Sequence, residues 1–515
     1  MNAFNWTGGR LRSLAVATVL GATLAAAPAL ARDLRFAFGA PILTLDPGTS
    51  AGTQAQTVRY AIMETLVTYE PETMEIVPLL AESWETAEDG VTWTFHLRSG
   101  VKFHDGSPLT AGDVAASLNR ILDPDGGFGR RSHLAEIAEV AAVDDLTVKI
   151  VTRAPSGTLL RVLALDTASV LSAASLEQYG DQVGWNPVGT GAFRYDSHVA
   201  EQSITVVRND DYWGEKAGMD RIVFQIVTEP STRLAMLEAG EIDVITEVPG
   251  FEVARLEEQP GISLIEKAST RVGHIGINTR QGPLTDVRVR QAINFAIDKT
   301  AIVQGVLRGL GEPADSVIAP GVNGYAPQDL YSYDPEKAKA LLAEAGASDL
   351  ALTIWTPQGR YFMDRETVVA VQAMLRAVGI NAAVEVIDWS TYLAELRKPE
   401  GENKSELYWL GWESGTADIQ YILDTVFSSE RIPPNGWNTM FYDNADVEQM
   451  RKDMSVELDP AKRQELADAA QRQIMSDAPW APVYTYVQVT AYREGLTGLA
   501  YLPTDVYILK TVHEE

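Results

Sequence analysis

Segments with the periodicity of a β-strand alternate with segments with the periodicity of an α-helix along most of this chain, and this alternation restricts the fold more than any other feature. The strand pattern is clearest in residues 91–97, VTWTFHL, where every second residue is apolar after a turn at Asp89 and Gly90. Residues 222–226, IVFQI, repeat it. The sequence therefore predicts an α/β architecture made of strands with one buried face and helices packed against them.

Helix signals are equally clear. Asp334 followed by Pro335 predicts the start of a helix that ends at Gly346. Thr110 and Asp113 have the spacing of a capping box in front of a second helix. Apolar stripes predict further helices that open at Ser231 and at Asp286, and one that runs from Val368 to Gly379. Core packing explains each stripe, so we assign none of them to a binding site.

The first 31 residues have the layout of a secretory signal peptide. Arg10 and Arg12 precede a mostly apolar run over residues 14–27, and Ala29 and Ala31 form the small-x-small pattern of a cleavage site. The alternative is a membrane anchor, but the run is shorter than the roughly 20 residues that span a bilayer. We therefore expect cleavage after Ala31, and because no cysteine follows we expect no lipid anchor. The mature protein is expected in the periplasm.

Charge and cysteine content exclude several classes of function. The chain has 42 Lys and Arg against 70 Asp and Glu, and removing residues 1–31, which hold two Arg and no acid, takes the net charge from −28 to −30. Such a surface repels the phosphates of nucleic acids, so we expect no nucleic-acid partner. The absence of cysteine excludes thiol catalysis, thiolate metal sites and redox chemistry.

Catalytic and metal-binding signatures are missing. Gly189, Thr190 and Gly191 are too short a run for a dinucleotide fingerprint, and the chain has no phosphate-binding loop and no nucleophile elbow. The six histidines are scattered without the spacing of metal ligands. His96 and His104 are the nearest pair, and a strand face and a turn explain them. We expect no catalytic residue, no metal and no cofactor, although carboxylate pairs are too numerous to test from the sequence.

Several blocks resemble the family 5 extracellular solute-binding proteins, the peptide-, nickel- and glutathione-binding proteins of ABC importers. They lie in the family's order over the whole chain after the cleavage site. They are the region 64–124 with LRSGVKFHDGSPLTAGDV at 97–114, PVGTGAF at 187–193, EPSTRLAMLEAGEIDVI at 229–245, HIGINTRQGPLTDVRVRQAINFAIDKTAIV at 274–303, and YDPEKAKALLAEAG at 333–346.

This resemblance implies a three-lobe periplasmic binding protein fold. Lobe I would be discontinuous and the other two lobes would be inserted into it. The expected ranges are 32–64, 190–273 and 483–515 for lobe I, 65–189 for lobe II, and 274–482 for lobe III. Two crossing segments, near 271–277 and 483–489, would join lobes I and III, which would close on a ligand between them as hinged lobes do.

Arg360 is the first candidate for ligand contact. Residues 356–359 form a turn after a predicted strand and present Arg360 in front of the helix that contains Val368. In peptide-binding relatives an arginine at the matching place binds the carboxylate of the ligand, and a guanidinium offers two parallel donors to a carboxylate. The alternative is an ordinary loop arginine paired with Asp364 or Glu366.

The second candidate segment follows an apolar strand that ends at Trp412. Trp412 would either pack on an apolar part of the ligand or belong to the core. The best-known peptide binders carry in this loop an aspartate that holds the amino terminus of the ligand, and Gly415 stands at that place here. The candidate residues are Trp412, Glu413, Ser414, Gly415, Thr416 and Asp418, of which Glu413 and Asp418 are the acids that would replace the missing aspartate.

The sequence thus predicts a monomeric binding protein without catalytic activity, which captures a peptide or another small carboxylated ligand for the transmembrane subunits of an ABC importer. Binding of an oligosaccharide or of a metal chelate by the same fold is an alternative. An exported hydrolase and an inert surface protein are the alternatives from other classes.

Overall fold

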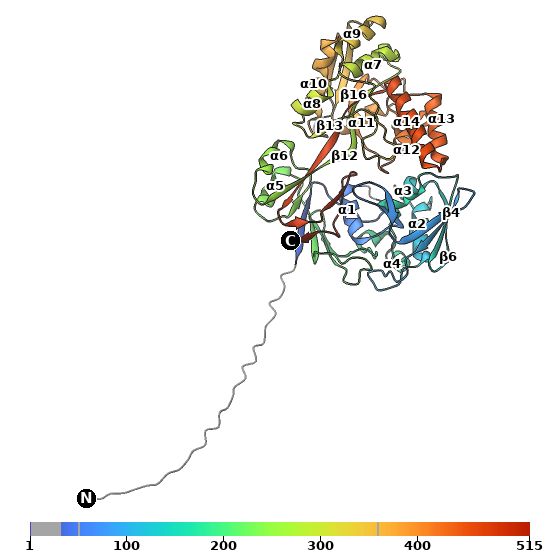
Figure 1. Cartoon of the computed structure of the whole chain (residues 1–515), viewed down its shortest axis with the longest axis vertical. Helices are drawn as coiled ribbons and strands as arrows, with labels where there is room; N and C mark the ends of the chain where they lie inside the picture. Colours follow the sequence, from blue (N-terminus) through green and yellow to red (C-terminus); the bar gives the residue numbers. More distant parts are fainter. Residues whose placement is uncertain (2–31, 50–51, 358–359) are drawn as a thin grey trace.

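The computed structural model describes residues 1, 32–49, 52–357 and 360–515, and Figure 1 shows their arrangement. Residues 2–31, which include nearly all of the predicted signal peptide, lie outside the described part, as do Gln358 and Gly359 of the turn predicted before Arg360. In the described ranges no helix has the length and apolar character needed to cross a membrane.

One large mixed sheet runs through most of the molecule. Its strand order is β15-β14-β16-β12-β17-β11-β1-β10-β9-β8, and β13 pairs with β17 outside this path. The strands are β1 (Asp33–Phe38), β8 (Phe193–Val199), β9 (Ser203–Arg208), β10 (Arg221–Ile226), β11 (Val244–Ile245), β12 (Ile262–Ile277), β13 (Gly311–Pro313), β14 (Leu350–Thr356), β15 (Ile380–Val386), β16 (Leu407–Trp412) and β17 (Trp480–Arg493).

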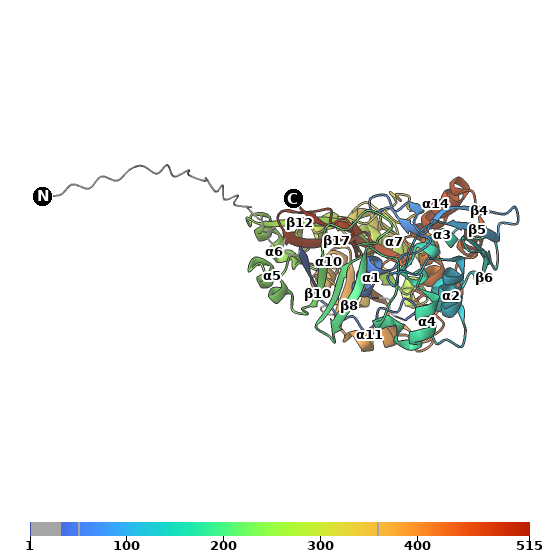
Figure 2. The ribbon, with the colours of Figure 1, turned by 90° about the horizontal axis from the view of Figure 1, so that it is seen from below.

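The two longest strands, β12 and β17, join the two halves of this sheet. They pair antiparallel, from Ile262 with Arg493 at one end to Gly276 with Trp480 at the other, and Figure 2 shows them side by side. The segments 271–277 and 483–489, predicted to cross between lobes, lie inside these strands. The pairing is interrupted between Ala268 and Val272. An irregularity of this kind bends a strand and redirects its side chains, and Arg271 lies in it.

The half of the sheet around β1 is covered by helices and closed by the end of the chain. Aromatic rings of Phe36, Phe38 and Phe224 contact one another at its centre, and Tyr507 contacts Phe36. Leu171 and Val183, from the range predicted as lobe II, also pack into this core. The elements here are α1 (Thr53–Ile62), α4 (Ala173–Tyr179), α5 (Pro230–Glu238), α6 (Gly250–Glu257), β18 (Leu496–Thr497), β19 (Ala500–Leu502), β20 (Val506–Ile508) and β21 (His513–Glu514).

A second core is built mainly from residues 66–170, and Ala417, Leu502 and Val506 also pack into it. Its four-stranded sheet has the order β4-β5-β7-β6 and packs against α2. The predicted capping box is confirmed, because Thr110 and Asp113 bond reciprocally at the start of α2, and the predicted strand at 91–97 is β5. The elements are β2 (Val67–Tyr69), β3 (Ile76–Pro78), β4 (Ala81–Thr86), β5 (Thr92–Leu97), β6 (Ile137–Asp144), β7 (Thr147–Thr152), α2 (Ala111–Leu122) and α3 (Leu159–Ala164).

The remaining half of the large sheet, β14 to β16, is flanked by helices from residues 287–477. The predicted caps at Asp286 and Asp334 are confirmed, since each side chain accepts a hydrogen bond from a backbone N–H of the first turn. The helix predicted at Ser231 in the other half begins one residue earlier, at Pro230. The helices here are α7 (Val287–Ala296), α8 (Lys299–Gly305), α9 (Pro335–Glu344), α10 (Asp364–Ala377), α11 (Trp389–Leu396), α12 (Ile419–Ile422), α13 (Ala445–Val456) and α14 (Pro460–Asp477).

Candidate ligand-binding site

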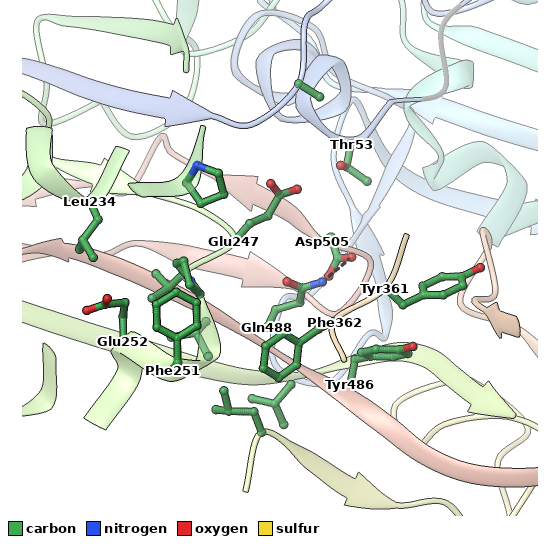
Figure 3. Close-up of a pocket in the computed structure, with 18 of the residues that line it drawn as sticks. Thr53, Leu234, Glu247, Phe251, Glu252, Tyr361, Phe362, Tyr486, Gln488 and Asp505 are labelled. Carbon is green, nitrogen blue, oxygen red and sulfur yellow. Dashed lines mark hydrogen bonds between the residues drawn. The ribbon is translucent and has the colours of Figure 1, made fainter. Parts of the chain in front are cut away.

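A cavity of about 990 Å³ lies beside the two crossing strands. Its walls come from α5, α6 and β17 on one side, and from residues 360–362 and Glu413 on the other. These two sides belong to the ranges predicted as lobe I and lobe III. Figure 3 shows part of the lining, with Gln488 of β17 hydrogen-bonded to Asp505. A volume of this size is at the upper end of the ~300–1,000 Å³ of small-molecule sites.

Arg271 lies where the pairing of β12 and β17 is interrupted, and its side chain faces the cavity. Its guanidinium forms an ion pair with Glu413, with 2.5 Å between Nη2 and Oε2, and lies 6.0 Å from the centre of the Tyr361 ring. Burial alone would lower the pKa of Arg271, but the neighbouring Glu413 and Asp505 raise it above its ordinary value. Glu413 keeps 35% of its side chain exposed, so a ligand can still reach this carboxylate.

Asp505 is the second acid near this pair. It lies in the turn between β19 and β20 with a φ of 63°, a left-handed conformation that aspartate adopts more readily than most residues. Its carboxylate accepts hydrogen bonds from Tyr501 Oη and, at 3.2 Å, from Gln488 Nε2. Burial, followed by repulsion from Glu413, raises the pKa of Asp505 to about 6, although Arg271 opposes the shift. This carboxyl therefore changes charge close to neutral pH.

Arg360 stands at the cavity edge and is exposed. Its backbone N–H donates to Asp364 Oδ2 at 3.0 Å, while its guanidinium carbon lies 5.1 Å from the Tyr361 ring centre and 5.2 Å from that of Trp389. Within the described ranges we find no ion pair between the guanidinium and Asp364 or Glu366, the partners of the alternative interpretation. Aromatic rings thus support this cation while it remains open to an anion.

All the other predicted contacts except Asp418 line two smaller cavities. Trp412 stacks at a tilt against Trp437, with 5.6 Å between ring centres, and lines a cavity of about 310 Å³ together with Arg271 and Arg360. A cavity of about 170 Å³ is lined by Glu413, Ser414, Gly415 and Thr416. Ser414 is buried, and its hydroxyl exchanges hydrogen bonds with the backbone of Asp418. Glu413 lines all three cavities, so they are neighbours around this side chain.

Asp418 has a different environment from the one predicted. Its side chain is fully buried and forms ion pairs with Arg463 at 2.6 Å and with Arg161 at 3.4 Å. It also accepts a hydrogen bond from Asn323 at 2.7 Å and caps α12 through the N–H of Gln420. A carboxylate with these partners has no face left for a ligand, so we remove Asp418 from the candidate site. It instead links α3 to α14.

Sequence reasoning missed Arg271, Asp505 and Gln488 at the main cavity. Arg271 had a usable signal, because it is the charged residue at the start of the predicted crossing segment 271–277. Asp505 and Gln488 gave none, since a hairpin turn near the end of the chain and a polar residue in a strand are both ordinary features.

Comparisons with known proteins match most of this chain. The family model described as "Bacterial extracellular solute-binding proteins, family 5 Middle" matches residues 75–433. The glutathione-binding protein GsiB of Escherichia coli O157:H7 is 32% identical over 496 residues, which cover 96% of each chain.

Two solved structures extend the comparison. HbpA2 from Haemophilus parasuis has a TM-score of 0.85 at 28% identity, over 94% of this chain and 100% of that one. The ABC transporter-associated periplasmic binding protein DppA from Helicobacter pylori, solved in complex with the peptide STSA, has a TM-score of 0.75 at 30% identity. The match covers 94% of this chain and 98% of that one.

Proposed function

Because the chain belongs to the family 5 bacterial extracellular solute-binding proteins, and is thus a solute-binding component of an ABC importer, we propose that its ligand is a small zwitterion. This ligand carries both a carboxylate and an ammonium group, as a short peptide does. The observation that carries the proposal is the placement of Arg271, Arg360, Glu413 and Asp505 around one cavity.

Arg360 is proposed to bind the carboxylate. A carboxylate that leaves water between two lobes needs a partner to offset its lost hydration, and the acidic net charge makes this need greater. Arg360 is exposed at the edge of the cavity and its guanidinium can offer two parallel N–H donors. Arg271 is less available, because its ion pair with Glu413 already occupies one end of the guanidinium.

Glu413 and Asp505 are proposed to receive the ammonium group. Both lie near Arg271, and repulsion from Glu413 adds to burial in raising the pKa of Asp505. A cationic group of the ligand relieves this repulsion. Gly415 stands where better-known peptide binders carry an aspartate, so the acids at 413 and 505 supply the charge from other positions. The name of GsiB gives glutathione as its ligand, and DppA was solved with a peptide. Glutathione and a peptide with free termini each carry the required pair of charges.

The same proposal includes export and the absence of catalysis. The mature protein would begin at Arg32, act in the periplasm as a monomer, and deliver its ligand to the transmembrane subunits of the importer. No chemistry is proposed, because the chain belongs to a family of solute-binding proteins. No histidine is present among the described lining residues of the main cavity.

Calorimetric titration of the mature protein with glutathione and with Ala-Ala tests this proposal. At least one should bind, and blocking either terminus of the dipeptide, by N-acetylation or by C-terminal amidation, should weaken binding tenfold or more. Equal binding of blocked and unblocked forms would contradict the zwitterion assignment. Arg365→Ala is a matched control for arginine variants, because Arg365 is an exposed cation on α10 that lines none of the cavities described above.

A further inference from the structure

Apolar side chains also line the main cavity, next to the acids Glu229, Glu238, Glu247 and Glu252. Figure 3 shows Leu234 and Phe251 on one side of the cavity, Asp505 and Tyr361 on the other, and Phe362 between them. Leu310 also lines this cavity and belongs to the same apolar cluster as Leu234. The four side chains Leu234, Phe251, Leu310 and Phe362 are called the apolar wall below.

Three members of the wall are fixed by packing. Leu234 of α5 and Leu310, just before β13, are buried, and Phe362 packs against their cluster. The start of α6 closes on this group so tightly that a Cβ atom on Gly250 would lie 2.3 Å from Phe362 Cζ and 2.7 Å from Leu310 Cδ1. A side chain at position 250 would have to displace the ends of Phe362 and Leu310, so the glycine lets α6 approach them closely.

Phe251 differs from its neighbours. It lies in the first turn of α6, next to Gly250, and is 60% exposed although it borders a cavity. A phenylalanine ring in water loses the stabilisation that burial would give, and covering it with an apolar group recovers that stabilisation. Of the nearby acids, Glu238 and Glu252 both pair with Arg255 at 2.6 Å, and Glu247 pairs with Arg233 at 3.3 Å.

We propose that the apolar wall is a specificity subsite that receives a bulky apolar group of the ligand. This inference rests on the proposed function, because the wall shares its cavity with the charged residues that would hold the head group. Leu234 and Phe251 come from one side of the cleft, and Leu310 and Phe362 from the other. An apolar group placed between them contacts both sides, so it favours the closed arrangement of the lobes. Preferred ligands are therefore zwitterions with a large apolar side chain.

Titration of the mature protein with three dipeptides, Gly-Gly, Ala-Ala and Leu-Leu, and with glutathione tests the subsite. Affinity should rise from Gly-Gly to Leu-Leu by about tenfold to a hundredfold, the range expected for burying one large aliphatic side chain. Phe251→Ala should reduce this preference for Leu-Leu about tenfold and leave Gly-Gly binding unchanged, and Phe251→Leu should restore most of it. Val369→Ala, at an exposed apolar residue of α10 that lines none of these cavities, is the control.

The outcomes separate the subsite from the function. If Phe251→Ala weakens Gly-Gly and Leu-Leu equally, or if Gly-Gly or glutathione binds more tightly than Leu-Leu, the subsite is wrong and the zwitterion proposal stands. If the parent binds none of the four compounds, the zwitterion proposal fails and the subsite fails with it. Phe251 is mostly exposed, so its variants should melt at the parent's temperature, and a melting curve checks this.

Discussion

Lowering the pH from 7 to 5 should weaken the binding of an ammonium-bearing ligand through Asp505. The charged groups around this carboxyl are Glu413, Arg271 and Glu247, and Tyr501 donates a hydrogen bond to it. A pKa of about 6 means that roughly nine-tenths of the carboxyl is ionised at pH 7 and roughly one-tenth at pH 5. If the ammonium binds the ionised form, the apparent affinity falls about tenfold, or about 1.4 kcal/mol.

The sign follows from linkage. A bound ammonium lowers the pKa of the carboxyl, so binding near pH 6 releases a proton, and affinity rises with pH up to about 7. Calorimetry with Ala-Ala at pH 5, 6 and 7, in two buffers that differ in ionisation enthalpy, measures both the affinity and the number of protons released. Asp505→Asn removes the titrating group and keeps a residue that tolerates the left-handed backbone. An affinity that is constant from pH 5 to 7, or a pH dependence that persists in the Asn variant, would refute this reasoning.

Four further outcomes are expected. Arg360→Ala should weaken binding of a carboxylated ligand about tenfold to a hundredfold by calorimetry, with Arg360→Lys recovering only part of it; parent-like affinity in the Ala variant would contradict the anchor. Asp418→Ala should destabilise the fold by about 3–5 kcal/mol in denaturant unfolding, because it leaves two arginines without their buried partner; an unchanged midpoint would show that the ion pairs contribute little. In the empty protein, Asp505→Asn should be more stabilising, relative to the parent, at pH 7 than at pH 4. The pKa of Asp505 is about 6 in the folded protein and ~3.9 in the unfolded chain, so the parent loses stability as the pH rises between these values and the Asn variant does not. Melting curves of both proteins at both pH values test this. N-terminal sequencing of the periplasmic form should start at or near Arg32, whereas an intact Met1 would contradict the proposed cleavage.

Sequence patterns predicted many helices and strands, because helix caps and strand alternation depend on residues that are close together in the chain. The cap at Asp334 and the capping box at Thr110 depend on residues three positions apart, and the strand at 92–97 depends on a period of two. The mutual arrangement of the lobes came instead from family resemblance. The exact lobe boundaries stay a prediction, and Leu171 and Val183 show why: a residue inside one predicted lobe can pack into the core of another.

The candidate site was only partly predictable, because it joins residues that are far apart in the sequence. Arg271 meets Glu413 across 142 positions, and Asp505 approaches both from the last hairpin. Nothing in the spacing of acids within 413–418 distinguished Glu413, which faces the cavity, from Asp418, which turns inward to Arg463. That distinction depends on α14, whose packing no local pattern reveals.

The most direct test of ligand capture is mass spectrometry of what the purified periplasmic protein releases on denaturation, before and after prolonged incubation of the folded complex. We expect about one equivalent of an unaltered small molecule that carries an ammonium group, a carboxylate and an apolar side chain. Recovery of a ligand without a carboxylate, or of a conversion product that accumulates with time, would contradict this expectation.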